Sequence, residues 1–133
     1  MLNTPATILV VEDSPDVREL LVSLLARSGY IVNSAPNGKI ALEIFQALRP
    51  DLILLDLSMP VMDGWQTLAA IRGLPGGAQQ IVAALTAHAL PYEREEGLRR
   101  GFNAYITKPI DIRAFLQTIA MLLQQDKSQD FAG

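Results

Sequence analysis

The sequence predicts an α/β fold: a doubly wound, five-stranded parallel sheet in the order 2-1-3-4-5, with five helices. Short, continuously apolar runs alternate along the 133 residues with segments whose apolar residues recur at helical spacing. Runs that are apolar at every position are typical of parallel strands, which are covered on both faces. Strands and helices that alternate with right-handed crossovers build such a sheet, and this order places the first and third strands side by side.

The predicted strands are too short for free-standing helices and are rich in branched aliphatic residues. Each of the five runs ends at, or leads directly into, a charged or hydroxyl-bearing residue, as where Thr7-Ile8-Leu9-Val10-Val11 leads into Glu12-Asp13. The strands are predicted over residues 7–11, 30–34, 52–56, 81–85 and 104–107.

Capping residues bound the predicted helices. Ser14 and Pro15 provide an N-cap followed by proline at the first helical position, and Gly29 provides the stop. The Gly-rich segment 73–77 is expected to be a loop. Helices are predicted over residues 15–28, 38–48, 65–72, 92–100 and 111–124, the last with a one-sided apolar stripe.

Composition limits the class of protein. A chain of 133 residues is expected to form one domain, and the absence of cysteine excludes thiol chemistry and fits a cytoplasmic location. The formal net charge of -3 and the pI of about 5.0 argue against a nucleic-acid surface, because phosphate binding needs clustered Lys and Arg. No apolar run approaches the roughly 20 residues that a membrane span requires.

Polar side chains at the strand ends form the candidate site. In this topology the carboxyl ends of the strands meet at one edge of the sheet, where ligands bind at the switch point between strands one and three. Asp56 ends the third strand and is the central residue of the predicted site. The others are Glu12, Asp13, Thr86 and Lys108.

The charges of this group predict a Mg²⁺ site. Three carboxylates and Lys108 leave a formal charge of -2, which one divalent cation would balance, and oxygen-only ligands favour Mg²⁺ over Zn²⁺. Such an ion leaves positions open for a phosphoryl oxygen, with Lys108 and Thr86 as further contacts. Asp56 would then act as nucleophile and become an acyl phosphate, which would draw Thr86 and Lys108 inward as a switch.

Four motifs at matching spacing resemble the bacterial response-regulator receiver domain, of the chemotaxis-regulator kind, over residues 6–124. They are Glu12-Asp13, the stretch from Asp56 to Gly64, Thr86-Ala87, and the stretch from Tyr105 to Pro109. The resemblance implies a flavodoxin-like fold, with residues 1–125 as the receiver domain and 126–133 as a polar tail.

The resemblance also implies the role of each site residue. Asp56 would be the phosphoacceptor, Thr86 and Lys108 would contact the phosphoryl group, and the ring of Tyr105 would rotate inward on activation. The Lys108-Pro109 peptide bond would be cis. The implied Mg²⁺ ligands are Glu12, Asp13, Asp56 and the backbone carbonyl of Ser58, and the positions that tune hydrolysis of the acyl phosphate are Ser58 and His88.

The implied function is a phosphorylation-controlled switch in a two-component phosphorelay. A phosphohistidine on a sensor histidine kinase or histidine phosphotransfer protein would donate to Asp56, and the output partner is not encoded in the sequence. The chain would not be an enzyme acting on outside substrates. We expect a stand-alone regulator, and the alternative is a receiver cut from a larger protein such as a hybrid kinase. The resemblance also allows a homodimer through the fourth helix, fifth strand and last helix.

Three other functions stay open at this point. A phosphatase of the haloacid dehalogenase type needs a second acid two residues after its nucleophilic Asp, where this chain has Ser58. A flavodoxin-like cofactor binder needs a Gly- and hydroxyl-rich phosphate loop where this chain has Glu12-Asp13. A receiver used unphosphorylated as a docking module is the third.

Three residues near the site have simpler roles as well. Asp63 and Gly64 are expected to form a turn, in which Asp63 caps a helix and Gly64 takes a positive φ. His88 is expected to be a loop residue rather than a phosphodonor. Trp65 is expected to pack near the site.

Overall fold

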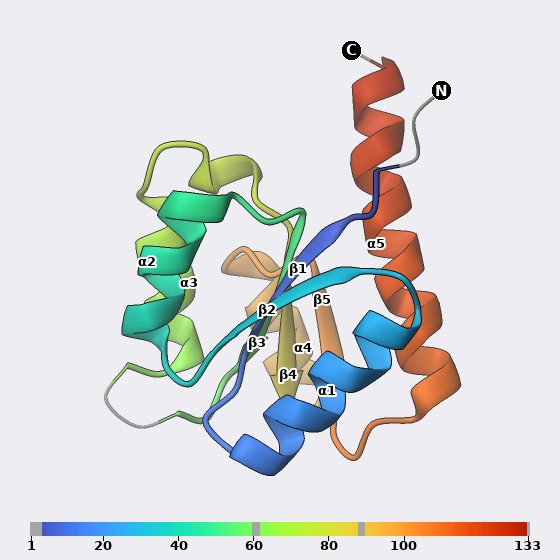
Figure 1. Cartoon of the computed structure of the whole chain (residues 1–133). Helices are drawn as coiled ribbons and strands as arrows, with labels where there is room; N and C mark the ends of the chain where they lie inside the picture. Colours follow the sequence, from blue (N-terminus) through green and yellow to red (C-terminus); the bar gives the residue numbers. More distant parts are fainter. Residues whose placement is uncertain (1–3, 60–61, 88–89, 133) are drawn as a thin grey trace.

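The computed structural model describes residues 4–59, 62–87 and 90–132, with side chains described as far as Gln124. Its five parallel strands form one sheet in the order β2-β1-β3-β4-β5, which confirms the predicted fold (Figure 1). The strands are β1 (Thr7–Val11), β2 (Ile31–Ala35), β3 (Leu52–Asp56), β4 (Val82–Thr86) and β5 (Ala104–Thr107). The helices are α1 (Pro15–Arg27), α2 (Gly38–Leu48), α3 (Gly64–Arg72), α4 (Pro91–Arg99) and α5 (Ile112–Ala132), with a 3₁₀ helix η1 (Gly77–Gln79).

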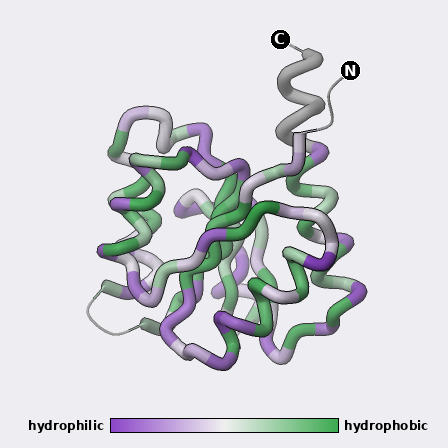
Figure 2. The backbone as a smooth tube through the Cα atoms, viewed as in Figure 1, coloured by the Kyte–Doolittle hydropathy of each residue, from purple (hydrophilic) through white to green (hydrophobic). Residues whose placement is uncertain are grey.

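Helices cover both faces of the sheet (Figure 1). Successive strand residues point to opposite faces, so the central strands are buried along their whole length, and Figure 2 shows them as a hydrophobic centre. On β3, Leu52 and Leu54 pack with α1 and α5, while Ile53 and Leu55 pack with α2 and α3. Two apolar clusters, one on each face, therefore hold the sheet in place.

Two strands begin one residue later than predicted. The Tyr30 amide donates to the Leu25 carbonyl, so Tyr30 belongs to the stop of α1 rather than to β2. Ile81 accepts a hydrogen bond from the Ile53 amide but lies just before β4, and Thr86 is the last residue of that strand, in register with Thr107. Hydrogen-bond pairing across the sheet, which has no local signature, sets these boundaries.

Two helical segments differ from the sequence prediction. The Gly-rich loop leads into the short helix η1, which begins after Gly76 at φ +80°. Helix α5 continues to Ala132, beyond the predicted end at Gln124. Residues 124–132 contain no glycine or proline to stop a helix, so the polar segment predicted as a tail is helical there. Within the described residues, no helix is long and apolar enough to cross a membrane.

Candidate functional site

The parallel sheet brings the predicted site residues to one edge. Val11 is in register with Leu55, so Glu12, the next residue after β1, comes level with Asp56 at the end of β3. Thr86 ends β4, and the Lys108 amide donates to its carbonyl over 2.7 Å, which ties the exit of β5 to β4. Residues that are far apart in the sequence therefore meet because four strands end at the same level.

Lys108 links two of the acids. Its Nζ lies 2.9 Å from Glu12 Oε1 and 3.5 Å from Asp56 Oδ1. The Lys108-Pro109 peptide bond is cis, in agreement with the prediction. Lys108 therefore reaches back across the sheet edge from β5 to the acids that follow β1 and β3.

Three carboxylates converge beside this lysine. Glu12, Asp13 and Asp56 each place one oxygen within 4.8 Å of the others. Glu12 and Asp56 are only 1% and 3% exposed, while Asp13 is half-buried. Carboxylate oxygens alone, with a formal charge of -2 left after Lys108, match the ligand set that a hard divalent cation prefers. The residues present therefore fit Mg²⁺.

Burial and like charge change the acid strength of Asp56. Removal from water raises the pKa of its carboxyl group, the negative charge of Glu12 raises it further, and Lys108 partly opposes both, so that the pKa is about 7. For Lys108, burial lowers the pKa, but its contacts with Glu12 and Asp56 outweigh this effect and raise it. The site without a cation therefore holds more negative charge than its surroundings stabilise.

Backbone groups hold the two buried acids. The Ser58 amide donates to Asp56 Oδ1 over 3.2 Å, and the Ser14 amide donates to Glu12 Oε2 over 3.3 Å. Arg18, from the first turn of α1, donates to the Glu12 carbonyl over 2.8 Å. The sequence reasoning missed Arg18, and only its place one turn after the Ser14 cap could have suggested that it faces the site.

Asp63 caps α3 as predicted. Its side chain accepts from the Gln66 amide, while the Gln66 side chain accepts from the Asp63 amide, which forms a capping box. The expectation for Gly64 was wrong, because Gly64 is not among the glycines with positive φ. A Cβ at this position would lie 2.6 Å from the Asp56 carbonyl oxygen and 2.7 Å from Leu57 Cα. Glycine is needed there because α3 begins against the backbone of the site.

A cavity of about 450 Å³ lies beside the acids and opens between α3, β4 and α4. Thr86, which is 3% exposed, and Tyr105, which is 5% exposed, both line it. The Tyr105 ring is already inward in this structure, whereas the resemblance linked the inward position to activation. Of the two residues predicted to tune hydrolysis of the acyl phosphate, Ser58 is exposed and lines this cavity, and His88 lies outside the described residues.

Trp65 lines the same cavity, so its fluorescence is expected to report on the site. It also contacts the Phe102 ring at 5.4 Å between centroids and the Arg100 guanidinium at 4.3 Å. Because it is the only tryptophan, titration of Mg²⁺ is expected to change its emission in a saturable way. The same titration of Asp13→Asn should show a weaker change, and an unchanged wild-type signal would contradict a cation site close to Trp65.

Comparison with known proteins decides the family. The model of the response regulator receiver domain matches residues 8–120. The chain belongs to the response-regulator receiver family. Its sheet order and its five α-helices are therefore those of a receiver domain, a signalling domain rather than a catalytic enzyme.

Individual relatives agree with this assignment. An uncharacterised 14.6 kDa protein of Leptolyngbya boryana is 46% identical over 104 residues, which are 78% of this chain and 79% of the relative. The response regulator MprA of Mycolicibacterium vanbaalenii is 36% identical over 97% of this chain, which spans about half (55%) of MprA. The solved receiver domain of the sensor histidine kinase PA1611 from Pseudomonas aeruginosa PAO1 has a TM-score of 0.83 and 31% identity. That match covers 91% of this chain and 99% of the PA1611 domain, which has a magnesium ion coordinated in its active-site cleft.

Proposed function

We propose that this receiver domain accepts a phosphoryl group on Asp56 from a phosphohistidine of a sensor histidine kinase or phosphotransfer protein. The observation that carries the proposal is the placement of Asp56 between two further acids and Lys108 at one edge of the sheet. A structural salt bridge would need one acid for one lysine, whereas this site gathers three acids, two of them buried. Surplus buried carboxylate is costly unless a cation balances it.

The transfer is a nucleophilic displacement at phosphorus. One carboxylate oxygen of Asp56 attacks, the new P–O bond forms as the P–N bond to the histidine breaks, and the electron pair leaves with the imidazole nitrogen. The ionised form of Asp56 is the nucleophile. Lys108 Nζ lies 3.5 Å from Asp56 Oδ1, so it is close enough to contact a phosphoryl oxygen on Asp56 and to balance part of its negative charge.

Glu12, Asp13, Asp56 and the Ser58 carbonyl would hold the Mg²⁺ that the donor set fits. The ion, when bound, supplies positive charge beside the transferring group. Glu12 forms an ion pair with Lys108 and accepts a hydrogen bond from the Ser14 amide, so its carboxylate is oriented before a cation binds. The half-buried Asp13 is the ligand best placed to exchange with solvent.

Phosphorylation would change the domain through the residues around the phosphoryl group. Added negative charge at Asp56 would draw Lys108 and the Thr86 hydroxyl toward it. This would favour the inward position of Tyr105, which lies beside Thr86 in the cavity, over an outward one, so that partner binding changes. The chain would catalyse only its own phosphorylation and dephosphorylation. Ser58 and His88 would tune the lifetime of the acyl phosphate.

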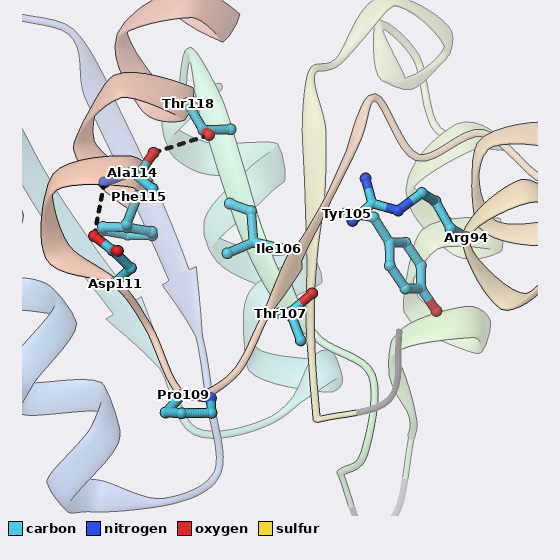
Figure 3. Close-up of a pocket in the computed structure, with 9 residues that line it drawn as sticks. All are labelled: Arg94, Tyr105, Ile106, Thr107, Pro109, Asp111, Ala114, Phe115 and Thr118. Carbon is cyan, nitrogen blue, oxygen red and sulfur yellow. Dashed lines mark hydrogen bonds between the residues drawn. The ribbon is translucent and has the colours of Figure 1, made fainter. Parts of the chain in front are cut away.

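The surface that would read this change lies on the far side of Tyr105. A second cavity, of about 330 Å³, runs between α4, β5 and α5, and Tyr105, Ile106 and Phe115 are among its lining residues (Figure 3). Because Tyr105 lines both cavities, this face is where an output partner or a second copy of the chain would sense the site. A cytoplasmic location, where such kinases act, is part of the proposal.

Acetyl phosphate tests the proposal. The protein is incubated with acetyl phosphate and Mg²⁺, and its intact mass is measured. We expect the mass to increase by one phosphoryl group, and we expect no increase when EDTA replaces Mg²⁺ or when Asp56→Asn is used.

Asp63→Asn is the matched control, because Asn also caps a helix and the change removes one acid from the same loop. This variant should gain the phosphoryl group as the wild type does. A wild-type protein that gains nothing under any condition would favour a docking module that works unphosphorylated. An adduct that persists in Asp56→Asn would place the phosphoryl group on another residue.

A further inference from the structure

Helix α4 buries almost none of its side chains against the rest of the domain. Gly97 is its only buried residue, whereas each of the other four helices has apolar side chains in one of the two apolar clusters. The apolar side chains Leu98 and Tyr92 are 47% and 67% exposed. Apolar side chains therefore contribute little to the position of α4, and the residue that the helix buries is Gly97.

Gly97 lies directly against the ring of Tyr105. A Cβ at position 97 would be 2.6 Å from Tyr105 Cε1 and 2.9 Å from Cδ1, closer than real Cβ contacts. The glycine has an ordinary helical environment and no positive φ, so backbone conformation does not explain it. Its missing side chain leaves the space that the inward Tyr105 ring fills.

Aromatic rings continue this contact toward the phosphoacceptor side. Tyr105 packs edge-on against Phe102 with centroids 6.5 Å apart, and Phe102 packs edge-on against Trp65 at the start of α3. Arg94 of α4 and Arg100, the residue that caps its C-terminal end, lie over these rings. The Arg94 side chain lies beside the Tyr105 ring (Figure 3), with its guanidinium 6.0 Å from the ring centroid, and the Arg100 guanidinium lies over Trp65.

The inward position of Tyr105 also carries a cost. Its hydroxyl is buried and has no hydrogen-bond partner within the described part of the chain. A buried polar group without a partner disfavours the conformation that buries it. The ring is therefore held inward by packing on Gly97 and Phe102 and destabilised there by its own hydroxyl, which is the balance expected of an element with two positions.

We propose that Gly97 is the positioning residue of the switch: it forms the seat on which α4 rests against the inward Tyr105 ring, so that outward movement of this ring unseats the helix. Arg94 and Arg100 also contact the aromatic rings, but both are exposed, so their contacts stabilise the position of α4 less than the packing at Gly97 does. The coupling of this seat to phosphorylation rests on the proposed function, whereas the seat itself does not.

The test replaces Gly97 and follows Tyr105. Protein labelled with 3-fluorotyrosine gives one ¹⁹F NMR signal for each of its three tyrosines, and Tyr105→Phe identifies the signal of Tyr105. In the wild type a soluble paramagnetic agent should broaden the Tyr105 signal only slightly, because the ring is buried. Gly97→Ala should expose it and lower the Tm by roughly 5–10 °C, although alanine is the better helix former.

Two further variants separate the seat from a general packing defect. In a Tyr105→Leu background, Gly97→Ala should lower the Tm by less than half as much, because the smaller side chain leaves room for the methyl group. Tyr105→Phe, which keeps the ring and removes the hydroxyl, should raise the Tm by a few degrees. This second measurement remains informative if Gly97→Ala does not fold.

Glu95→Ala, at an exposed position of α4, is the matched control and should leave the Tyr105 signal shielded. Gly97→Ala with an unchanged Tyr105 signal and Tm would overturn the seat, and so would a Tm loss of equal size in the Tyr105→Leu background. Acetyl phosphate with Mg²⁺ should still phosphorylate Gly97→Ala. Failure of the wild type to accept phosphate would overturn the proposed function and leave the seat standing.

Discussion

Asp56→Asn is expected to stabilise the protein without Mg²⁺ at pH 8 by about 2 kcal/mol. A pKa raised from 3.8 to about 7 corresponds to at most about 4 kcal/mol, and solvent around the site reduces this figure. The raised pKa means that Asp56 favours folding below pH 4 and that this contribution is lost as the pH rises toward 7. The increase in the free energy of unfolding that Asp56→Asn brings should therefore be small at pH 4 to 5 and reach its full size above pH 7. Urea unfolding at each pH measures it.

In the presence of Mg²⁺ the wild type should become more stable than Asp56→Asn. The ion binds the folded wild type and stabilises it by mass action, whereas the variant lacks one of the three carboxylates. Asp16→Asn, which removes an exposed acid from the first turn of α1, is the control and should bring no gain. Equal stability of wild type and Asp56→Asn at pH 8 in EDTA would contradict the charge surplus at the site.

Gly64→Ala is expected to destabilise the protein by about 3 kcal/mol and to slow phosphorylation. The new methyl group would meet backbone atoms of Asp56 and Leu57 at 2.6 and 2.7 Å, and neither can move without shifting the phosphoacceptor or the start of α3. Urea unfolding measures the loss of stability, and the mass increase with acetyl phosphate over time measures the effect on the site.

Gly73→Ala is the matched control at the other end of the same helix. The nearest atoms to its Cβ would be 3.7 Å away, and its backbone is in the right-handed helical region. This variant should be as stable as the wild type or more stable by up to about 1 kcal/mol. If both variants behave alike, close approach is not the reason for glycine at position 64.

Much of the site could be predicted because it depends on where strands end. Once the alternation of strands and helices indicates a 2-1-3-4-5 sheet, Glu12, Asp56, Thr86 and Lys108 must meet at its carboxyl edge. The acids at the cluster also carry a local signature, an apolar run that ends in a carboxylate. The roles of these residues in phosphoryl transfer and Mg²⁺ binding stay predictions that the experiments above address.

The sequence by itself determined the fold class, the number and order of the strands and α-helices, and the residues at the sheet edge, because hydrophobic periodicity and capping are local properties of the chain. Only the tertiary structure decided why Gly64 and Gly97 are glycines, that Arg18 holds the Glu12 carbonyl, and that Tyr105 is inward. These facts depend on the distance between atoms of residues that are far apart in the sequence or on different elements. A glycine required by a neighbour's backbone or ring looks the same in the sequence as one required by a turn.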